Sequence, residues 1–322
     1  MKAAVVREAG QTPVYDEFAE PTPSFGDSRI RVTAAALSQV AKSRAAGKHY
    51  SSSGQFPFVA GVDGVGRLDD GRRVYFILPK APYGSMAELA IVPSAQCVPL
   101  PEELDDMTAA AIANPGMSSW AAYVERAKLK AGETVLINGA TGTAGRLAVQ
   151  IAKHLGARKI IATGRNMEIL RSVLALGADV TIPLHENDAG LEQRFTEQFA
   201  AGVDVVIDYL WGKSAETLLR AGANAGADAV PIRFVQVGAA SGSDITLPSA
   251  ILRSAAIELM GSGLGSVRGD RFIYCIGELL KATVPSGFKI ATKVVPLSEV
   301  ESAWHKSDSN LRTVFTVDEN DR

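Results

Sequence analysis

Cysteine is scarce in this sequence, and its scarcity limits both metal sites and disulfides. The 322 residues include two cysteines, Cys97 and Cys275, which stand far apart among apolar residues. A structural zinc site of four cysteines therefore cannot be built from this chain. Two isolated thiols of this kind are typical of a reducing compartment, so we expect a cytoplasmic protein.

Long hydrophobic runs and basic clusters are missing as well. No stretch approaches the roughly 20 apolar residues of a membrane-spanning helix, and residues 1–8 are too poor in them for a secretion signal. Thirty-three basic residues nearly balance 35 acidic ones, with no basic run suited to nucleic acid. We expect neither a membrane nor a nucleic-acid partner. With 47% hydrophobic and 21% charged residues, the chain is predicted to be globular, with two domains.

A glycine-rich turn between an apolar strand and an amphipathic helix is the main motif present. Val135–Ile137 is typical of a buried strand, and Leu147, Ile151 and Leu155 recur at helical spacing. A pyrophosphate can dock on such a helix N-terminus if small residues allow close approach. The strict dinucleotide pattern has glycine where this chain has Ala140, so a structural turn without a ligand is the alternative. The predicted cofactor contacts in this turn are Gly139, Ala140, Thr141, Gly142, Thr143, Ala144 and Gly145.

Short apolar runs then alternate with helical patterns, which predicts an α/β fold with a doubly wound parallel sheet. The expected strands after the first are 159–163, 180–182, 203–207, 234–237 and 257–260. Residues 1 to about 115 are expected to be β-rich, and residues 107–127 to form two helices that meet at a turn at 114–116. The tail after residue 263 is expected to return to the first domain.

The end of the second strand distinguishes NADP from NAD. An NAD site usually places a carboxylate there, whereas this strand ends in Thr163, Gly164, Arg165 and Asn166. A guanidinium can bind the 2′-phosphate of NADP bidentately. The sequence therefore favours NADPH, with a solvated surface arginine as the alternative interpretation of Arg165.

With these residues placed, the chain resembles the medium-chain dehydrogenase/reductase superfamily, and within it the zinc-free quinone oxidoreductases of the zeta-crystallin type. The resemblance covers nearly the whole length and rests on several segments in order, among them Gly61-Val-Asp63-Gly-Val-Gly66, 84–88, 129–137, 204–208, 296–300 and 312–314. It implies a GroES-like β-rich catalytic domain formed by residues 1–118 and 264–322, around a Rossmann NADP(H)-binding domain at 119–263. It also implies a dimer.

The resemblance also allows residues of the site to be assigned. Zinc-dependent relatives hold their metal with a Cys and a His where this chain has Ser38 and Val62, so we expect no metal. Without a Lewis acid, the expected reaction is hydride delivery from NADPH to a quinone or a conjugated carbonyl compound. Tyr50 and Ser38 are the candidates to contact the acceptor. Family positions that line the cofactor correspond to Ser118, Gly238, Ala239, Leu264 and Arg312.

Two other functions and one assembly question stay open at this point. The chain could be an enoyl-thioester or alkenal reductase, or a non-catalytic NADPH-binding protein of the sensor or crystallin kind. Residues 255–261 are expected to form the last strand of the sheet, an apolar edge with the single charge of Glu258 and no proline. Pairing of this edge with a second copy predicts a homodimer; a covered edge would leave a monomer.

Overall fold

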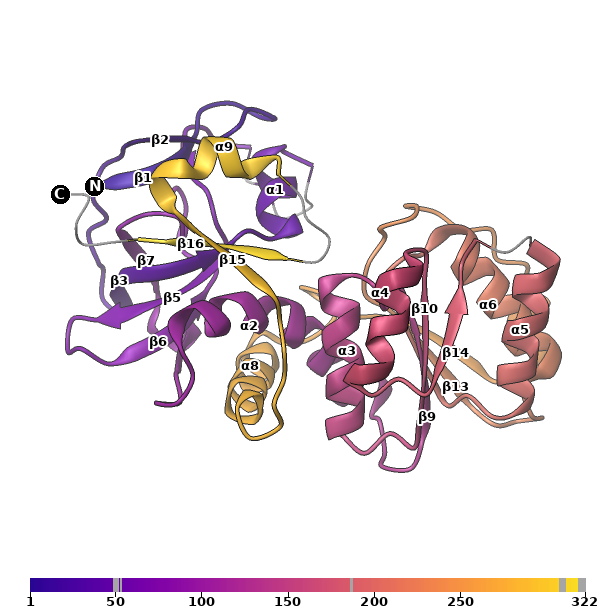
Figure 1. The fold of residues 1–322 in the computed structure, drawn as a ribbon. Coiled ribbons are helices and arrows are strands. Elements are labelled where there is room, and N and C mark those ends of the chain that lie inside the picture. The colour runs from indigo at the N-terminus through magenta and orange to yellow at the C-terminus, as the bar shows by residue number, and fades with distance from the viewer. Residues whose placement is uncertain (49–51, 53, 186–187, 307–310, 318–322) are drawn as a thin grey trace. The chain divides into compact units, whose positions relative to one another are not determined.

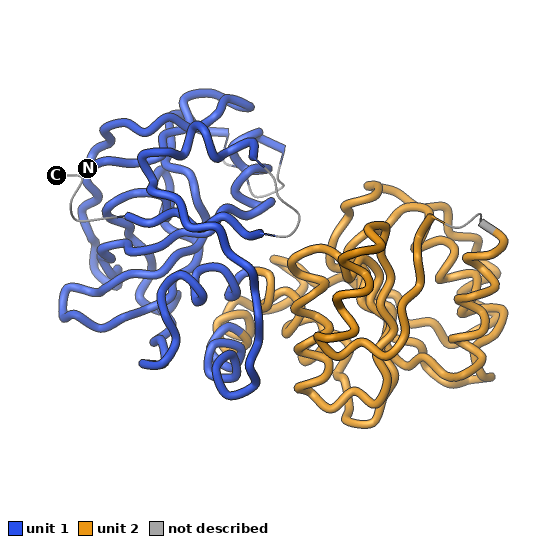
Figure 2. Tube along the Cα trace, in the orientation of Figure 1, with its two compact units in different colours: residues 1–114, 276–322 blue, residues 115–275 orange. Residues whose placement is uncertain are grey.

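The computed structural model describes all residues except 49–51, 53, 186–187, 307–310 and 318–322. The chain divides into two compact units (Figure 2). Unit 1 contains residues 1–114 and 276–322, and unit 2 contains residues 115–275. Two helices run from one unit into the other along the chain, α2 (Asp106–Ala121) and α8 (Gly269–Thr283). The domain boundaries at 118/119 and 263/264 stay predictions.

Unit 2 is built on a six-stranded parallel sheet with the order β11-β10-β9-β12-β13-β14. Figure 1 shows helices on both sides of this sheet. Its strands are β9 (Thr134–Asn138), β10 (Lys159–Gly164), β11 (Val180–Pro183), β12 (Val205–Asp208), β13 (Ile232–Gln236) and β14 (Ile257–Gly261). Its helices are α3 (Thr143–His154), α4 (Met167–Ser172), α5 (Asp188–Ala200), α6 (Gly212–Ala225) and α7 (Ile251–Ser254). The predicted doubly wound sheet is confirmed, with β14 at its edge.

The central strands of the sheet of unit 2, β9 and β12, are buried along their whole length. The strand residues Leu136, Ile161 and Val206 are fully or almost fully buried in one cluster. Phe195 and Phe199 of α5 pack into the same cluster. Parallel strands buried on both faces need such continuous apolar runs, and the short runs in the sequence supply them.

Unit 1 contains two further sheets. The first has the order β2-β1-β4, and the second has the path β15-β16-β3-β5-β6-β8, with β7 paired to β3. The strands are β1 (Lys2–Val6), β2 (Val14–Glu17), β3 (Asp27–Ala36), β4 (Phe58–Val59), β5 (Asp63–Leu68), β6 (Arg73–Ile77), β7 (Leu89–Pro93), β8 (Cys97–Pro99), β15 (Thr292–Pro296) and β16 (Arg312–Thr316). The helices α1 (Gln39–Ala45) and α9 (Val300–Trp304) complete the unit. Because β16 pairs antiparallel with β3, the end of the chain shares a sheet with its beginning.

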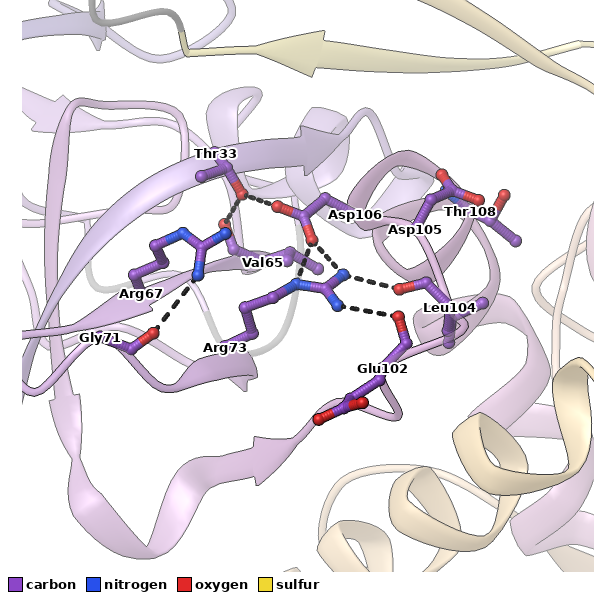
Figure 3. A network of polar contacts seen from close by, with 10 residues as sticks. All are labelled: Thr33, Val65, Arg67, Gly71, Arg73, Glu102, Leu104, Asp105, Asp106 and Thr108. Atoms are coloured by element: carbon purple, nitrogen blue, oxygen red, sulfur yellow. Dashed lines mark hydrogen bonds and ion pairs between the residues drawn. The ribbon is translucent and has the colours of Figure 1, made fainter.

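A polar network fixes the start of α2 to the strands of unit 1 (Figure 3). Arg73 on β6 forms an ion pair with Asp106, donating from Nε at 3.0 Å, and also donates to the carbonyl of Leu104 at 2.6 Å. The other carboxylate oxygen of Asp106 accepts from the hydroxyl of Thr33 on β3 at 2.6 Å. An acidic residue at the first turn of a helix also complements its dipole.

The predicted break at residues 114–116 was wrong. Helix α2 continues through Pro115 to Ala121, and a π-helical turn follows at Ala122–Ala127. The hydroxyls of Ser118 and Ser119 both donate to the carbonyl of Pro115, at 2.8 and 3.2 Å. Residues 109–113 are fully buried, so the packing of this alanine-rich stretch outweighs the cost of an interior proline.

Candidate functional site

The glycine turn after β9 has the backbone geometry that the sequence predicts. Gly139 has φ +93°, and a Cβ there would lie 2.9 Å from the side chain of Leu210. A Cβ at Gly145 would lie 2.3 Å from the carbonyl oxygen of Gly139, so the helix and the turn pack too closely for any side chain. Ala140 is fully buried and its methyl group is accommodated. The departure from glycine at 140 therefore leaves the turn intact.

The N-terminus of α3 is open for an anion. The helix begins at Thr143, and the capping residue Gly142 supplies no side-chain hydrogen bond to its amides. Gly142 is exposed, and a Cβ there would meet nothing closer than the Gly139 carbonyl at 3.8 Å. The first N–H groups of a helix have no partner within it, so they are oriented to bind a phosphate.

The turn lies where the strand order of the sheet reverses. Strand β9 pairs with β10 on one side and β12 on the other, and Asn138 lies opposite Asp208. The Asn138 side-chain amide donates to Asp208 at 2.8 Å, and its oxygen accepts from the hydroxyl of Thr163 at 2.8 Å. The same hydroxyl accepts from the Gly139 amide at 3.2 Å. Ligands of doubly wound sheets bind at such a switch point, and this buried network fixes its strand ends.

Asp208 also fixes the loop that follows β12. Its carboxylate accepts from the amides of Leu210 and Trp211, at 3.0 and 3.1 Å. Burial raises the pKa of this carboxyl, while these amide hydrogen bonds and that from Asn138 oppose the shift. Trp211 has φ +59°, a conformation that is strained for a bulky residue and that the two amide bonds help to hold.

The end of β10 lies against the glycine turn. A Cβ on Gly164 would lie 2.2 Å from the methyl carbon of Thr141, so the two segments are in contact. Arg165, the next residue, is exposed and makes no ion pair with any described residue. Asn166 is exposed and caps α4, accepting from the amide of Ile169 at 3.0 Å. An exposed guanidinium therefore follows directly on the strand end that touches the turn.

Sequence reasoning missed two residues beside this site, Ser119 and Tyr209. The Tyr209 hydroxyl lies 2.7 Å from Ser119 Oγ, although the two residues are 90 apart in sequence. Burial raises the pKa of Tyr209, while hydrogen bonds to Ser119 and Ser118 oppose the shift. A tyrosine directly after the strand that borders the switch point was the signal available in the sequence.

The other predicted cofactor residues of unit 2 occupy the loops after β13 and β14. The amide of Gly238 donates to the Asp208 carbonyl at 3.1 Å, and a Cβ there would lie 2.7 Å from the Tyr209 carbonyl. The loop after β13 therefore packs directly on the loop after β12. Ala239 is exposed, and Leu264 is 37% exposed.

Two residues of unit 1, Ser38 and Tyr50, are predicted to contact the molecule that accepts the hydride, and the structure describes only Ser38. Ser38 is buried and caps α1, its Oγ accepting from the Ala41 amide at 3.0 Å. An accepting hydroxyl still has its proton to donate. Tyr50 lies outside the described residues.

A buried carboxylate follows Val62 in unit 1. Asp63 accepts from the hydroxyl of Tyr75 at 2.9 Å and from the Asn114 side chain at 3.1 Å. Burial raises the pKa of Asp63 to about 6, against the opposing charge of Arg312 and these two hydrogen bonds. Nε and Nη2 of Arg312 are buried without a hydrogen-bond partner among the described residues. Such donors are costly to bury, so this guanidinium is a candidate to bind an anion.

Comparison with known proteins identifies the family. Residues 144–280 match the family model described as zinc-binding dehydrogenase. The chain is 29% identical to a probable NADPH-dependent quinone reductase of Emericella nidulans, over 98% of this chain and 100% of that protein. It is 30% identical to a quinone oxidoreductase of Rattus norvegicus, over 68% and 69%. The crystal structure of the Thermus thermophilus quinone oxidoreductase covers 98% of this chain and 100% of its own, with a TM-score of 0.83 and 27% identity.

The chain belongs to the medium-chain dehydrogenase/reductase superfamily, quinone oxidoreductase type. The description of the family model raises the question of zinc. Ser38 uses its oxygen to cap a helix, and Val62 has no ligand atom. Across the described residues, no three His, Cys, Asp or Glu side chains gather closely enough to hold a metal. The residues present therefore do not fit the zinc that zinc-dependent relatives hold.

Proposed function

We propose that this quinone oxidoreductase-type protein is an NADPH-dependent reductase, transferring hydride to quinones or related conjugated carbonyl compounds without a metal. The guanidinium of Arg165 is the observation that carries this proposal. It forms no ion pair with a described residue, and it directly follows the end of β10, which contacts the glycine turn. A 2′-phosphate at this place gains charge-assisted hydrogen bonds of about 1.5–3 kcal/mol each, and a 2′-hydroxyl gains much less. The names of the relatives given above agree with this cofactor.

Different residues of the proposed cofactor-binding site have different roles. The N-terminus of α3 takes the pyrophosphate, since no side chain caps its first amides, and the small residues of the glycine turn allow the pyrophosphate to approach closely. Arg165 takes the 2′-phosphate, and Arg312 takes an anionic part of the cofactor with its buried donors. The complete proposed set is Ser118, Gly139, Ala140, Thr141, Gly142, Thr143, Ala144, Gly145, Thr163, Gly164, Arg165, Asn166, Gly238, Ala239, Leu264 and Arg312. Thr163 and Asn166 act through the backbone that their side chains fix.

The protein's own contribution is to orient and protonate the acceptor. Bound NADPH supplies a hydride, and one proton taken up from solvent completes the two-electron reduction of a quinone to a hydroquinone. Ser38 Oγ has its hydrogen available to donate, and Tyr50 stays our second candidate for this contact. A quinone carbonyl is electrophilic without a Lewis acid, so a hydrogen-bond donor is sufficient to orient it.

Assembly and location complete the proposal. Strand β14 is the edge of the sheet and pairs only with β13 among the described strands, and Leu259 on it is 37% exposed. We propose a homodimer in which β14 of two copies pairs around a two-fold axis. None of the described helices is long and apolar enough to cross a membrane. Both cysteines are free thiols, which supports a reducing compartment such as the cytoplasm.

A substrate panel tests the proposed function. Anaerobic NADPH oxidation is measured with 1,4-naphthoquinone, with an alkenal and with an enoyl thioester. We expect the naphthoquinone to give the highest kcat/KM, with one hydroquinone formed per NADPH consumed. A higher kcat/KM for the enoyl thioester would assign the protein to the alternative reductase class. No oxidation of NADPH by any acceptor, together with tight NADPH binding, would favour a non-catalytic binding protein.

A further inference from the structure

A pocket in unit 1 combines a positive charge with apolar walls. It lies between α1 and residues 52, 54–56, 58–59, 61–62 and 81–83, and it is open to solvent. Arg44 is the only ionisable cation or carboxylate among the described lining residues. The rings of Phe56 and Phe58 form part of the wall, with centroids 5.4 Å apart and planes at 52°.

The charge in this pocket has no partner in the part of the chain that the structure describes. No described residue makes an ion pair or a side-chain hydrogen bond with Arg44, which is half-buried near the end of α1. Burial lowers the pKa of Arg44, yet a guanidinium stays protonated in proteins. Removing a charge from water without a partner is unfavourable, so an anion that enters the pocket would relieve this cost.

A second polar group lines the same pocket without a partner. Ser52 Oγ is buried and has no hydrogen-bond partner within the described part of the chain. Its hydroxyl can donate to an anion that pairs with the arginine. A guanidinium and a hydroxyl beside two aromatic rings match one ligand chemistry, an acidic group on a planar unsaturated body.

We propose that this pocket binds the acidic group of the acceptor, so that the preferred acceptors carry a carboxylate or sulfonate on a conjugated ring or alkene. Arg44 and Ser52 bind the acidic group, and the phenylalanine rings contact the planar body. This proposal rests on the proposed function, because it makes the pocket the acceptor site of the reductase. Val62 supports that placement, since it lies in the pocket wall at the family position of the zinc-binding His. Because the net charge of the chain is −2, the attraction for an anion comes from the local charge in the pocket and not from the charge of the whole protein.

Two matched pairs of compounds test the proposal. Steady-state NADPH oxidation is measured with 1,2-naphthoquinone and with 1,2-naphthoquinone-4-sulfonate. Binding is measured by calorimetry, without NADPH, for 2-naphthoate and for 2-naphthylmethanol. For the wild type we expect kcat/KM for the sulfonate to exceed that for the neutral quinone by on the order of tenfold. This is the difference in affinity expected from one charge-assisted hydrogen bond. We expect 2-naphthoate to bind more tightly than the alcohol by a similar factor.

Variants within one helix separate a local contact from a general charge effect. Arg44→Gln should lower the ratio of kcat/KM for the sulfonate to kcat/KM for the neutral quinone about tenfold, and it should abolish the preference for 2-naphthoate over 2-naphthylmethanol. Lys42→Gln removes a cation of the same helix that does not line the pocket, and both preferences should persist. Arg44→Lys should retain part of the preference, and Ser52→Ala should reduce it several-fold. These two variants keep the test usable if Arg44→Gln does not fold.

The outcomes distinguish this proposal from the proposed function. Equal use of both quinones with no binding of 2-naphthoate overturns the anion pocket and leaves the reductase standing. Binding of 2-naphthoate that depends on Arg44, without reduction of either quinone, supports the pocket and overturns the reductase. Equal losses in Arg44→Gln and Lys42→Gln would overturn the specific role of Arg44.

Discussion

The hydroxyl of Tyr209, directly after β12, lies 2.7 Å from Ser119 Oγ on α2. Ser119 also bonds to the carbonyl of Ala144 in α3 at 3.3 Å, so one serine joins three elements around the glycine turn. The pair therefore holds the loop of the switch point against the helix that follows the turn. Its removal is expected to affect the stability of unit 2 and the binding of the cofactor together.

Replacing Tyr209 with Phe should lower the free energy of unfolding by about 1 kcal/mol, because one neutral hydrogen bond is lost while the ring stays packed. Urea unfolding followed by circular dichroism measures this. Ser119→Ala should cost somewhat more, since that hydroxyl has further partners in Pro115 and Ala144. If Tyr209→Phe were as stable as the wild type, the bond would be unimportant for the fold.

Asp63 is expected to make stability depend on pH between about 4 and 6. Its pKa is raised to about 6 in the folded protein, so the folded state holds a proton that the unfolded state has released. The free energy of unfolding should therefore fall as pH rises through this window, by up to about 3 kcal/mol, and level off above it. Asp63→Asn keeps an acceptor for Tyr75 and should lack this contribution.

The measurement for Asp63 is urea unfolding of the wild type and Asp63→Asn from about pH 3.5 to about pH 7, which spans the window between the unfolded and folded pKa values. The stability of the wild type relative to the variant should decrease over this range. A constant difference, or one that grows with pH, would contradict the raised pKa of the buried carboxyl.

Arg165→Ala should weaken NADPH binding by about 1.5–3 kcal/mol and leave NADH binding unchanged, because only NADPH has the 2′-phosphate. Arg171→Ala is the matched control, since Arg171 is an exposed arginine on the neighbouring helix α4. Fluorescence titration of the wild type and both variants with each cofactor gives six affinities. Equal weakening of NADPH and NADH in Arg165→Ala would place the phosphate elsewhere.

Metal removal should not alter activity, because Ser38 and Val62 provide no ligand set for catalytic zinc. Rates with a quinone are compared before and after dialysis against a chelator, and after zinc is added back. Activity lost on dialysis and restored by zinc would show that the family's metal is used here after all.

Leu259→Pro should convert the proposed dimer into monomers, because proline removes a donor from the edge strand β14. Sedimentation at micromolar concentration measures the mass. Leu259→Lys serves as a second variant that keeps the backbone donor and places a charge on the edge. A wild type that sediments as a monomer would refute the dimer directly.

Local patterns in the sequence were sufficient for the sheet of unit 2 and for its glycine turn. Apolar runs of strand length and the helical spacing after Gly145 are patterns among residues close in sequence. They can therefore be recognised without knowing the contacts between distant parts of the chain. The prediction for Pro115 failed because the local preference of proline was outweighed by burial of the preceding alanines. Tyr209, Ser119 and Arg44 were missed because their significance depends on contacts made by distant parts of the chain.

The protein uses NADPH to reduce a quinone, and we propose Arg165 as the source of its cofactor preference. The most direct measurement is kcat/KM of the wild-type protein for NADPH and for NADH, with 1,4-naphthoquinone as saturating acceptor. One charge-assisted contact predicts a preference for NADPH on the order of tenfold or more, and Arg165→Ala should remove most of it. Equal kcat/KM for the two cofactors, or a preference for NADH, would contradict the use of NADPH and the role of Arg165.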